Sequence, residues 1–247
     1  MRILFTNDDG YDSQGLHAVA DLFKDDNEIA VVAPDYQRSG ASHSLTLKPN
    51  MLTCKKIEGY GYDVYAVGGT PVDCVKFARN CVFKKPDLVI SGINRGENLG
   101  SDIWYSGTVS AAVDAAHSGL RAIALSAIDH KADKERLSGY ARFIKNNLSL
   151  LMEIELLPKT ILNINFPKGD PQGVKVVKMN TQETFIDGYD KQSGDTYIPS
   201  GYRDYSLLDK DSDEFWGLNG YITITPLMID RTEYRMLDML KDRKYKL

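Results

Sequence analysis

The sequence predicts an α/β fold built on a parallel sheet that helices cover on both faces. Strand and helix patterns alternate along residues 1–165, the strand patterns are continuous apolar runs, and each is followed by a polar or glycine-rich segment. Continuous apolar strands are typical of a parallel sheet buried on both faces. Ligands of such folds bind beyond the carboxyl ends of the strands, so the segments after the strands are the candidate functional segments.

Short apolar runs predict the strands, and apolar residues at helical spacing predict the helices. The expected strands are residues 3–6, 28–33, 63–67, 87–90, 122–126 and 161–165. The expected helices are residues 16–24, 71–82, 109–118 and 138–152. In the first helix, Leu16, Val19 and Phe23 share one face. Pro71 stands in the first turn of the second, where proline is favoured.

The C-terminal part of the chain has a different pattern. Residues 180–219 hold seven aromatic residues among Asp, Gly and Ser, without a clear period. A disordered tail is usually poor in aromatic residues, so we expect an ordered arm that packs on its own domain or on a partner subunit. A strand over residues 221–225, closed by Pro226, and a helix over residues 232–241 are expected to follow. We divide the chain into a catalytic core (1–179) and an arm (180–247) that is not an independent domain.

The composition excludes several classes of protein. The chain of 247 residues is 43% hydrophobic and 26% charged, as in ordinary globular proteins, which excludes bulk disorder and a collagen-like chain. A net charge of -4 without a basic block argues against a nucleic-acid duplex as partner. No apolar run is long enough to span a bilayer, and the first residues lack the layout of a signal peptide. We therefore expect a cytoplasmic protein, with Cys74 and Cys81 as buried core thiols.

Two adjacent carboxylates, Asp8 and Asp9, follow the first strand. Their mutual repulsion would be relieved by a cation, and Mg²⁺ or Mn²⁺ takes oxygen ligands of this kind. Taken alone, the pair is typical of a polar turn or a helix N-cap. Its place at the end of the first strand favours a metal site.

The loop after the second strand is rich in hydroxyl groups and contains Ser39 and His43. Hydroxyl groups can bind a hard metal or hold phosphate oxygens, although solvated Ser/Gly loops are also common. His43 has an ordinary pKa near neutrality, which suits a general acid or base. It fits equally well a loop histidine that only forms hydrogen bonds, and the sequence leaves both roles open.

Two further segments suit a phosphate and a metal. After the strand at residues 87–90, glycines recur at every fourth position, and Asn94 offers a neutral oxygen ligand. This segment has neither the GxGxxG pattern of dinucleotide sites nor the Lys-Ser/Thr of a P-loop. Farther on, Ser106, Gly107 and Thr108 enter a helix, whose free N–H groups form a natural phosphate site. Together the strand-end segments predict a metal with a phosphate.

Several motifs occur in a specific order over essentially the whole chain. They are ILFTNDDG (3–10), GTPVDCV (69–75), DLVISGINRGENLG (87–100), YSGTVSAA (105–112), LNINFP (162–167) and GYITITPL (220–227). In these motifs the sequence resembles the SurE family of stationary-phase survival proteins, which are metal-dependent 5'- and 3'-nucleotidases. The resemblance implies a Rossmann-like three-layer α/β/α core with a C-terminal β-rich extension and a terminal helix. It also implies homodimers or homotetramers assembled through the arm.

For the site, the resemblance implies hydrolysis of nucleoside 5'- and 3'-monophosphates and, in some members, of short-chain polyphosphate. One divalent ion per subunit, Mg²⁺ or Mn²⁺, would be held by Asp8, Asp9, Ser39 and Asn94, with Asp8 and Asp9 as the catalytic residues. The general base stays open among Asp9, His43 and metal-bound hydroxide. The expected phosphate and substrate contacts are Asn98, Ser106, Gly107, Thr108 and His43.

This chain departs from the family pattern in places. Asp114 stands where the family usually has Glu, which we expect to affect packing rather than chemistry, and residues 182–201 of the arm differ widely. The main alternative to an enzyme is a catalytically silent nucleotide-binding or regulatory module on the same loops. A covalent aspartyl-phosphate route is disfavoured because such phosphatases use Asp-x-Asp, whereas the two acids here are adjacent.

Overall fold

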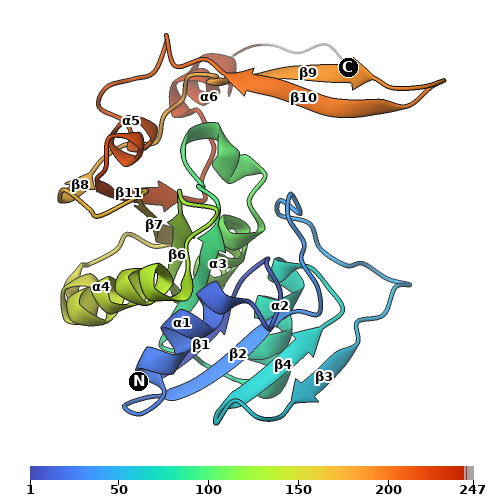
Figure 1. Ribbon diagram of the computed structural model, residues 1–247, viewed down its shortest axis with the longest axis vertical. Helices are drawn as coiled ribbons and strands as arrows, with labels where there is room; N and C mark the ends of the chain where they lie inside the picture. The colour runs from blue at the N-terminus through green and yellow to red at the C-terminus, as the bar shows by residue number, and fades with distance from the viewer. Residues whose placement is uncertain (242, 244–247) are drawn as a thin grey trace.

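A computed structural model describes residues 1–241 and 243 and places one large sheet at the centre of the molecule (Figure 1). Its strands are β1 (Arg2–Thr6), β2 (Glu28–Pro34), β3 (Cys54–Ile57), β4 (Asp63–Val67), β5 (Leu88–Arg95), β6 (Arg121–Ala127), β7 (Thr160–Phe166), β8 (Val174–Val176) and β11 (Ile222–Met228). They lie in the order β3-β4-β2-β1-β5-β6-β7-β11-β8. Strands β4, β2, β1, β5, β6 and β7 are parallel, as the apolar runs predict.

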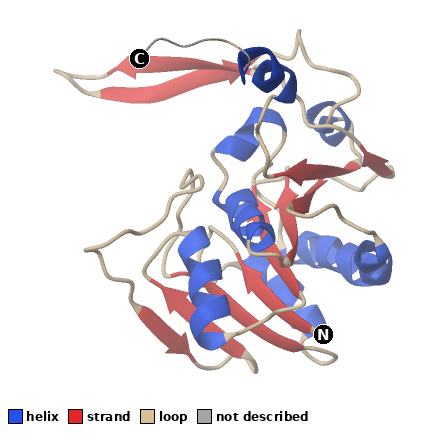
Figure 2. Cartoon of the chain, turned by 180° about the vertical axis from the view of Figure 1, so that it is seen from behind, coloured by secondary structure: helices blue, strands red, loops and turns tan. Residues whose placement is uncertain are grey.

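Helices cover both faces of this sheet (Figure 2). They are α1 (Gln14–Phe23), α2 (Pro71–Phe77), α3 (Gly107–His117) and α4 (Lys134–Glu153). Apolar side chains of α1 and α4 pack in one buried cluster with Ile3 and Phe5 of β1. Those of α2 and α3 pack with Leu4, on the opposite face of the same strand. The alternation of side chains along β1 thus produces two cores, and the predicted three-layer α/β/α fold is confirmed.

Local sequence signals determine where the helices begin. Ser13 caps α1 by accepting a hydrogen bond from Leu16 N. Thr70 and Asp73 form a reciprocal capping box at the start of α2, directly before and after Pro71 and Val72. These caps place the ends of the helices beside the carboxyl ends of the strands.

The C-terminal strand corrects one prediction. Pro226 was expected to close this strand, but β11 continues through it to Met228 and pairs antiparallel with β7. The proline is tolerated because β8 pairs only with Ile222–Ile224, so β11 has a free edge at Pro226. Since β11 lies within the main sheet, this part of the chain is built into the core.

Smaller differences follow from local context. The helix expected over residues 71–82 ends at Phe77 and continues as a π-helical turn, Ala78–Val82. Cys74 is buried as predicted, whereas Cys81, in that turn, is exposed, so its prediction as a core thiol is wrong. The sequence analysis also missed α5 (Asp213–Leu218) and a 3₁₀ helix at Gly100–Trp104.

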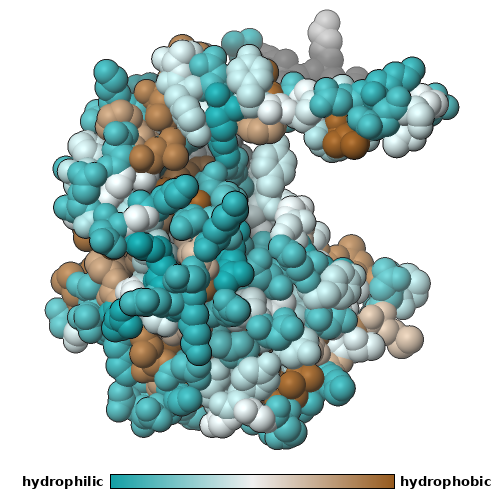
Figure 3. Space-filling view, viewed as in Figure 1, coloured by the Kyte–Doolittle hydropathy of each residue, from teal (hydrophilic) through white to brown (hydrophobic). Residues whose placement is uncertain are grey.

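The arm contains a two-stranded antiparallel hairpin, β9 (Phe185–Lys191) and β10 (Tyr197–Arg203), which projects from the core in Figure 1. The chain then passes through α5 and β11 to α6 (Tyr234–Lys241), which buries none of its residues. Hydrophobic side chains lie open on the hairpin (Figure 3), among them Ile186 and Ile198. Across residues 1–241, every helix is too short or too polar to cross a membrane.

Candidate active site

The two adjacent acids lie at the carboxyl end of β1, between the ends of β2 and β5. A tight turn holds them there: Asn7 Nδ2 donates to Gly10 O (3.0 Å), and Gly10 N donates back to Asn7 Oδ1 (3.2 Å). Gly10 has a φ of +108°, which an L side chain rarely adopts. The NDDG segment is therefore a fixed turn that presents Asp8 and Asp9 side by side.

Asp8 is buried, with 5% of its surface exposed. Its Oδ1 accepts a short hydrogen bond from the Thr108 hydroxyl in the first turn of α3. Burial raises the pKa of Asp8 to about 6, since the charge is poorly solvated; the Thr108 hydrogen bond opposes this rise, and the charge of Asp9 adds to it. This carboxylate would gain from a cation that compensates its buried charge.

Asp9 faces the loop that follows β2. The amide Nε2 of Gln37 lies 3.5 Å from Asp9 Oδ1 and 2.9 Å from Ser39 Oγ. The other carboxylate oxygen accepts from Arg95 N at 3.4 Å. Burial raises the pKa of Asp9, and the hydrogen bond from Arg95 partly offsets this rise. The partly positive amide of Gln37 thus sits between the two oxygens that a cation would share.

These observations test whether the residues fit a divalent cation. Asn94 donates its Nδ2 to Gly96 O (2.9 Å), which leaves its Oδ1 as the acceptor. The donor set is two carboxylates, the Ser39 hydroxyl and the Asn94 carbonyl oxygen, the hard oxygen ligands that Mg²⁺ and Mn²⁺ prefer. Among the residues that the structure describes, no three His, Cys, Asp or Glu side chains converge on a metal position, so the cation would rest on two acids and neutral oxygens. The oxygen atoms of these four residues therefore fit a divalent cation such as Mg²⁺ or Mn²⁺.

The start of α3 lies directly against Asp8. Ser106 is the N-cap of this helix and accepts from Val109 N at 3.0 Å. Gly107 follows so closely that a Cβ at its position would lie 2.8 Å from the Asp8 Cβ. The first-turn N–H groups of a helix attract anions. A helix start suited to phosphate therefore touches Asp8, one of the two acids suited to a cation.

Asn98 has a structural anchor. Its Nδ2 donates to Ser126 Oγ (2.7 Å), its backbone N–H donates to Asn165 Oδ1 (2.9 Å), and its carbonyl accepts from Asn163 Nδ2 (2.8 Å). These buried hydrogen bonds fix the glycine-rich loop over the ends of β6 and β7. The proposed contact of Asn98 with phosphate stays a prediction, and the second N–H of its amide is the group that would make it.

His43 lies apart from Asp9. Its Nε2 is 3.9 Å from Asp114 Oδ1, and Lys76 Nζ is 2.9 Å from the same oxygen. Asp114, which we expect to affect packing rather than chemistry, is a buried anion held by two basic side chains. Burial raises the pKa of Asp114, but the nearby His43 and Lys76 side chains outweigh this and lower it. His43 lines a cavity of about 730 Å³ with Trp104, while Asp9 lines a different one.

A cavity of about 350 Å³ beside Asp9 contains residues that sequence analysis missed. Its lining includes Asp9, Ser13, Gln14, Gln37, Arg95 and His130. Arg95 Nη2 donates to Gln14 Oε1 at 2.6 Å, which holds the guanidinium at the wall. Their positions in the sequence offer a partial signal. Gln37 and Arg95 lie close in the chain to the predicted metal ligands Ser39 and Asn94, and His130 follows the end of β6.

The fold is that of an α/β protein, and its candidate site, at the carboxyl edge of the sheet, combines two adjacent acids with a helix start. A family model described as Survival protein SurE matches residues 3–185. A 5'-nucleotidase SurE of Thermoanaerobacter sp. (strain X514) is 41% identical, with both chains covered completely. One of Pelotomaculum thermopropionicum is 38% identical over 98% of this chain and 94% of that protein.

Solved structures agree with these relatives. The crystal structure of the SurE protein from Aquifex aeolicus superimposes with a TM-score of 0.84 at 33% sequence identity, over 98% of each chain. The chain belongs to the SurE family.

Proposed function

We propose that the protein is a divalent-cation-dependent phosphomonoesterase that hydrolyses nucleoside 5'- and 3'-monophosphates to nucleoside and phosphate. The observation that carries this proposal is the hydrogen bond between Asp8 and Thr108, which joins the acids to the start of α3. A phosphate held at the helix start would then lie beside a cation held by the acids. Relatives with 34–41% identity bear the name 5'-nucleotidase SurE, in agreement with this chemistry.

In the proposed reaction Asp8, Asp9, Ser39 and Asn94 hold one Mg²⁺ or Mn²⁺. When bound, such an ion polarises the phosphate and lowers the pKa of a water for in-line attack. The backbone N–H groups of the first turn of α3 orient the phosphate and stabilise the charge that develops on it. Of the candidate bases, we propose Asp9, which lines the cavity, as the group that accepts a proton from the attacking water. The P–O bond to the nucleoside then breaks, and the leaving oxygen takes the proton that Asp9 received from the attacking water.

The arm is proposed to build a homodimer or homotetramer, with 1–179 as the catalytic core and 180–247 as an assembling arm whose strand β11 joins the sheet of that core. Support comes from the open apolar side chains of the hairpin and of α6, where Tyr234 and Met239 are 59% and 60% exposed. Apolar surface of this extent commonly marks an interface. We also propose a cytoplasmic location and activity on short-chain polyphosphate.

The test is phosphate release from a panel of 5'- and 3'-nucleoside monophosphates and short polyphosphate. We expect release with Mg²⁺ or Mn²⁺ and its loss when a chelator removes the ion, because Asp8 and Asp9 cannot anchor the substrate phosphate by themselves. Readdition of the ion should restore release. Metal-dependent nucleotide binding without phosphate release, measured by calorimetry, would instead favour the silent binding module.

Activity is expected to fall as the pH drops below about 6, where Asp8 takes up a proton and no longer attracts a cation. The midpoint should move to lower pH when the cation concentration is raised, because proton and cation compete for this carboxylate. The measurement is kcat/KM between pH 5 and 8 at two cation concentrations. An acid limb that does not move with the cation would contradict the role of Asp8.

The second carboxyl with a pKa raised to about 6, Asp213, does not add an unfolding transition to such an acid limb. Burial raises the pKa of Asp213 to about 6 as well, from 3.8. The folded state therefore binds this proton more tightly than the unfolded state, and the free energy of unfolding from this group rises as the pH falls through 6. Melting temperatures taken at each pH provide the control.

A further inference from the structure

The base of the arm carries an arginine surrounded by carboxylates. Arg203, the last residue of β10, is 26% exposed in its side chain. Its Nη2 lies 2.5 Å from Asp102 Oδ2 and 3.5 Å from Glu97 Oε1, and its Nη1 lies 3.4 Å from Glu214 Oε1. One guanidinium therefore holds three acids from three different segments.

Two of these segments carry the candidate active site. Glu97 lies in the glycine-rich loop, between Asn94 and Asn98. Asp102 belongs to the 3₁₀ helix that leads directly to Ser106 at the start of α3. The arm is thus tied through Arg203 to the loop that presents a cation ligand and to the segment that presents the phosphate cradle.

The third acid anchors the arginine itself. Glu214 is 3% exposed, and its carboxylate also accepts from Asn180 Nδ2 (2.7 Å) and Thr184 Oγ1 (2.8 Å). Charged groups that are half-buried and hydrogen-bonded on several sides have one preferred position. Arg203 is therefore a fixed point against which Glu97 and Asp102 are placed.

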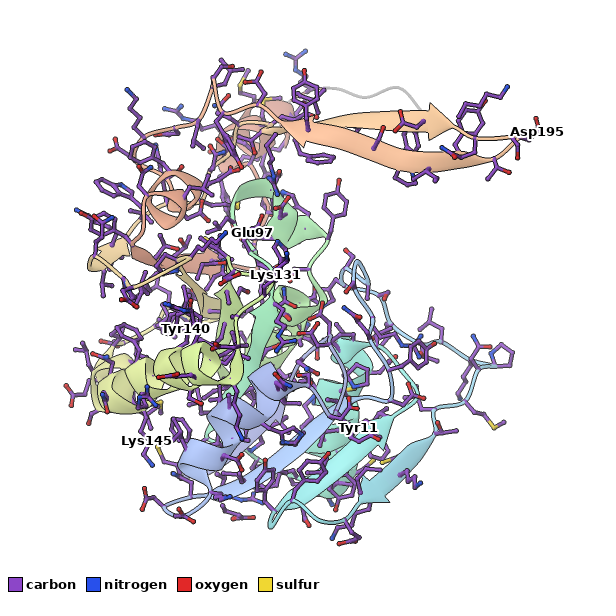
Figure 4. All side chains as sticks on the ribbon, viewed as in Figure 1. Tyr11, Glu97, Lys131, Tyr140, Lys145 and Asp195 are labelled. Carbon is purple, nitrogen blue, oxygen red and sulfur yellow. The ribbon has the colours of Figure 1, made fainter. Side chains whose placement is uncertain are left out.

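Glu97 links Arg203 to the cavity beside Asp9, because its carboxylate contacts both Arg203 and His130. While its Oε1 faces Arg203, its Oε2 lies 3.2 Å from His130 Nε2. His130 lines that cavity, and a Cβ added at Gly96 would lie 3.0 Å from its Cε1, so loop and ring are in close contact. In Figure 4 Glu97 lies between the sheet and the base of the hairpin.

We propose that Arg203 is a positioning residue for phosphate hydrolysis, acting through Glu97 on the glycine-rich loop and on His130. This inference rests on the proposed function. Arg203 does not touch the acids at Asp8 and Asp9; it fixes the segments that complete the site. The activity of the site thereby depends on the placement of the divergent arm.

The experiment is a double-mutant cycle on the full-length chain, with Arg203→Ala, Glu97→Gln and the combined variant. We expect kcat for a nucleoside monophosphate to fall about tenfold in each single variant, because small displacements of positioning groups reduce turnover. The combined variant should lose no more than either one, since both changes break the same link. Arg203→Lys restores the charge but not the two-pronged geometry, so it should recover only part of kcat.

The matched control is Arg136→Ala on α4. It removes an ion pair with Asp170 (3.2 Å), away from the site, and should leave kcat unchanged. Melting temperatures of the variants separate a positioning role from a loss of stability. If Arg203→Ala fails to fold, Glu97→Gln, which replaces only the carboxylate of the same link by an amide, still tests the proposal. A kcat within twofold of wild type in both single variants, or losses that multiply in the combined variant, would overturn the inference. Wild-type protein that releases no phosphate at all would overturn the proposed function instead.

Discussion

Replacing Asp9 by Asn should lower kcat at least about a hundredfold while leaving the melting temperature unchanged or higher. Loss of a group that merely supports a metal ligand typically costs 10- to 100-fold, so loss of a charged ligand should cost more. The fold should be spared because burial raises the pKa of Asp9, which means that its charge is unfavourable in the folded chain. An amide removes this charge and still accepts the hydrogen bond from Arg95 N.

The measurement is kcat and KM at saturating Mg²⁺, with melting curves of the same samples. Asp12→Asn is the matched control, because Asp12 is an exposed acid in the same segment with no proposed role. The control should keep normal turnover, and near-normal turnover of the Asp9 variant would remove Asp9 from the site.

The sequence predicts most of the core because its signals are local. A short apolar run such as the one in residues 28–33, closed by Pro34, predicts a strand buried on both faces, and Thr70-Pro71 marks the start of a helix. The end of β11 is not predictable from the local sequence, because a proline is tolerated in a strand only where the neighbouring strand does not pair with it. Here β8 is too short to reach Pro226, which leaves a free edge at that position. Partners along a sheet are not visible in the local sequence.

The candidate site divides in the same way. Asp8 and Asp9 are detectable because two acids after a strand form a local pattern. His130 and Arg203 are not detectable from the sequence, since the residues that they contact are distant in the chain. His130 reaches the cavity beside Asp9, and Arg203 meets Asp102 from 101 positions away. His43, an expected substrate contact, lies 3.9 Å from Asp114 Oδ1, and its contact with substrate stays a prediction.

Replacing Gly107 by Ala should lower kcat about 10- to 100-fold and the free energy of unfolding by about 1–3 kcal/mol. The added Cβ would lie 2.8 Å from Asp8 Cβ, 3.0 Å from Pro71 Cγ and 3.2 Å from Asp8 Oδ2. Something must therefore shift, and the carboxylate that accepts from Thr108 lies in the way. Displacing it separates the acids from the helix start.

Helix propensity alone predicts the opposite sign for stability, because Ala favours a helix over Gly by about 1 kcal/mol. Gly139→Ala in α4 tests that term separately, since a Cβ there meets only Arg142 Nη2 at 3.8 Å. We expect the Gly139 variant to be slightly stabilised and fully active. Calorimetric unfolding and kcat of the two variants decide the matter: if Gly107→Ala behaves like Gly139→Ala, the contact between α3 and Asp8 is not what organises the site.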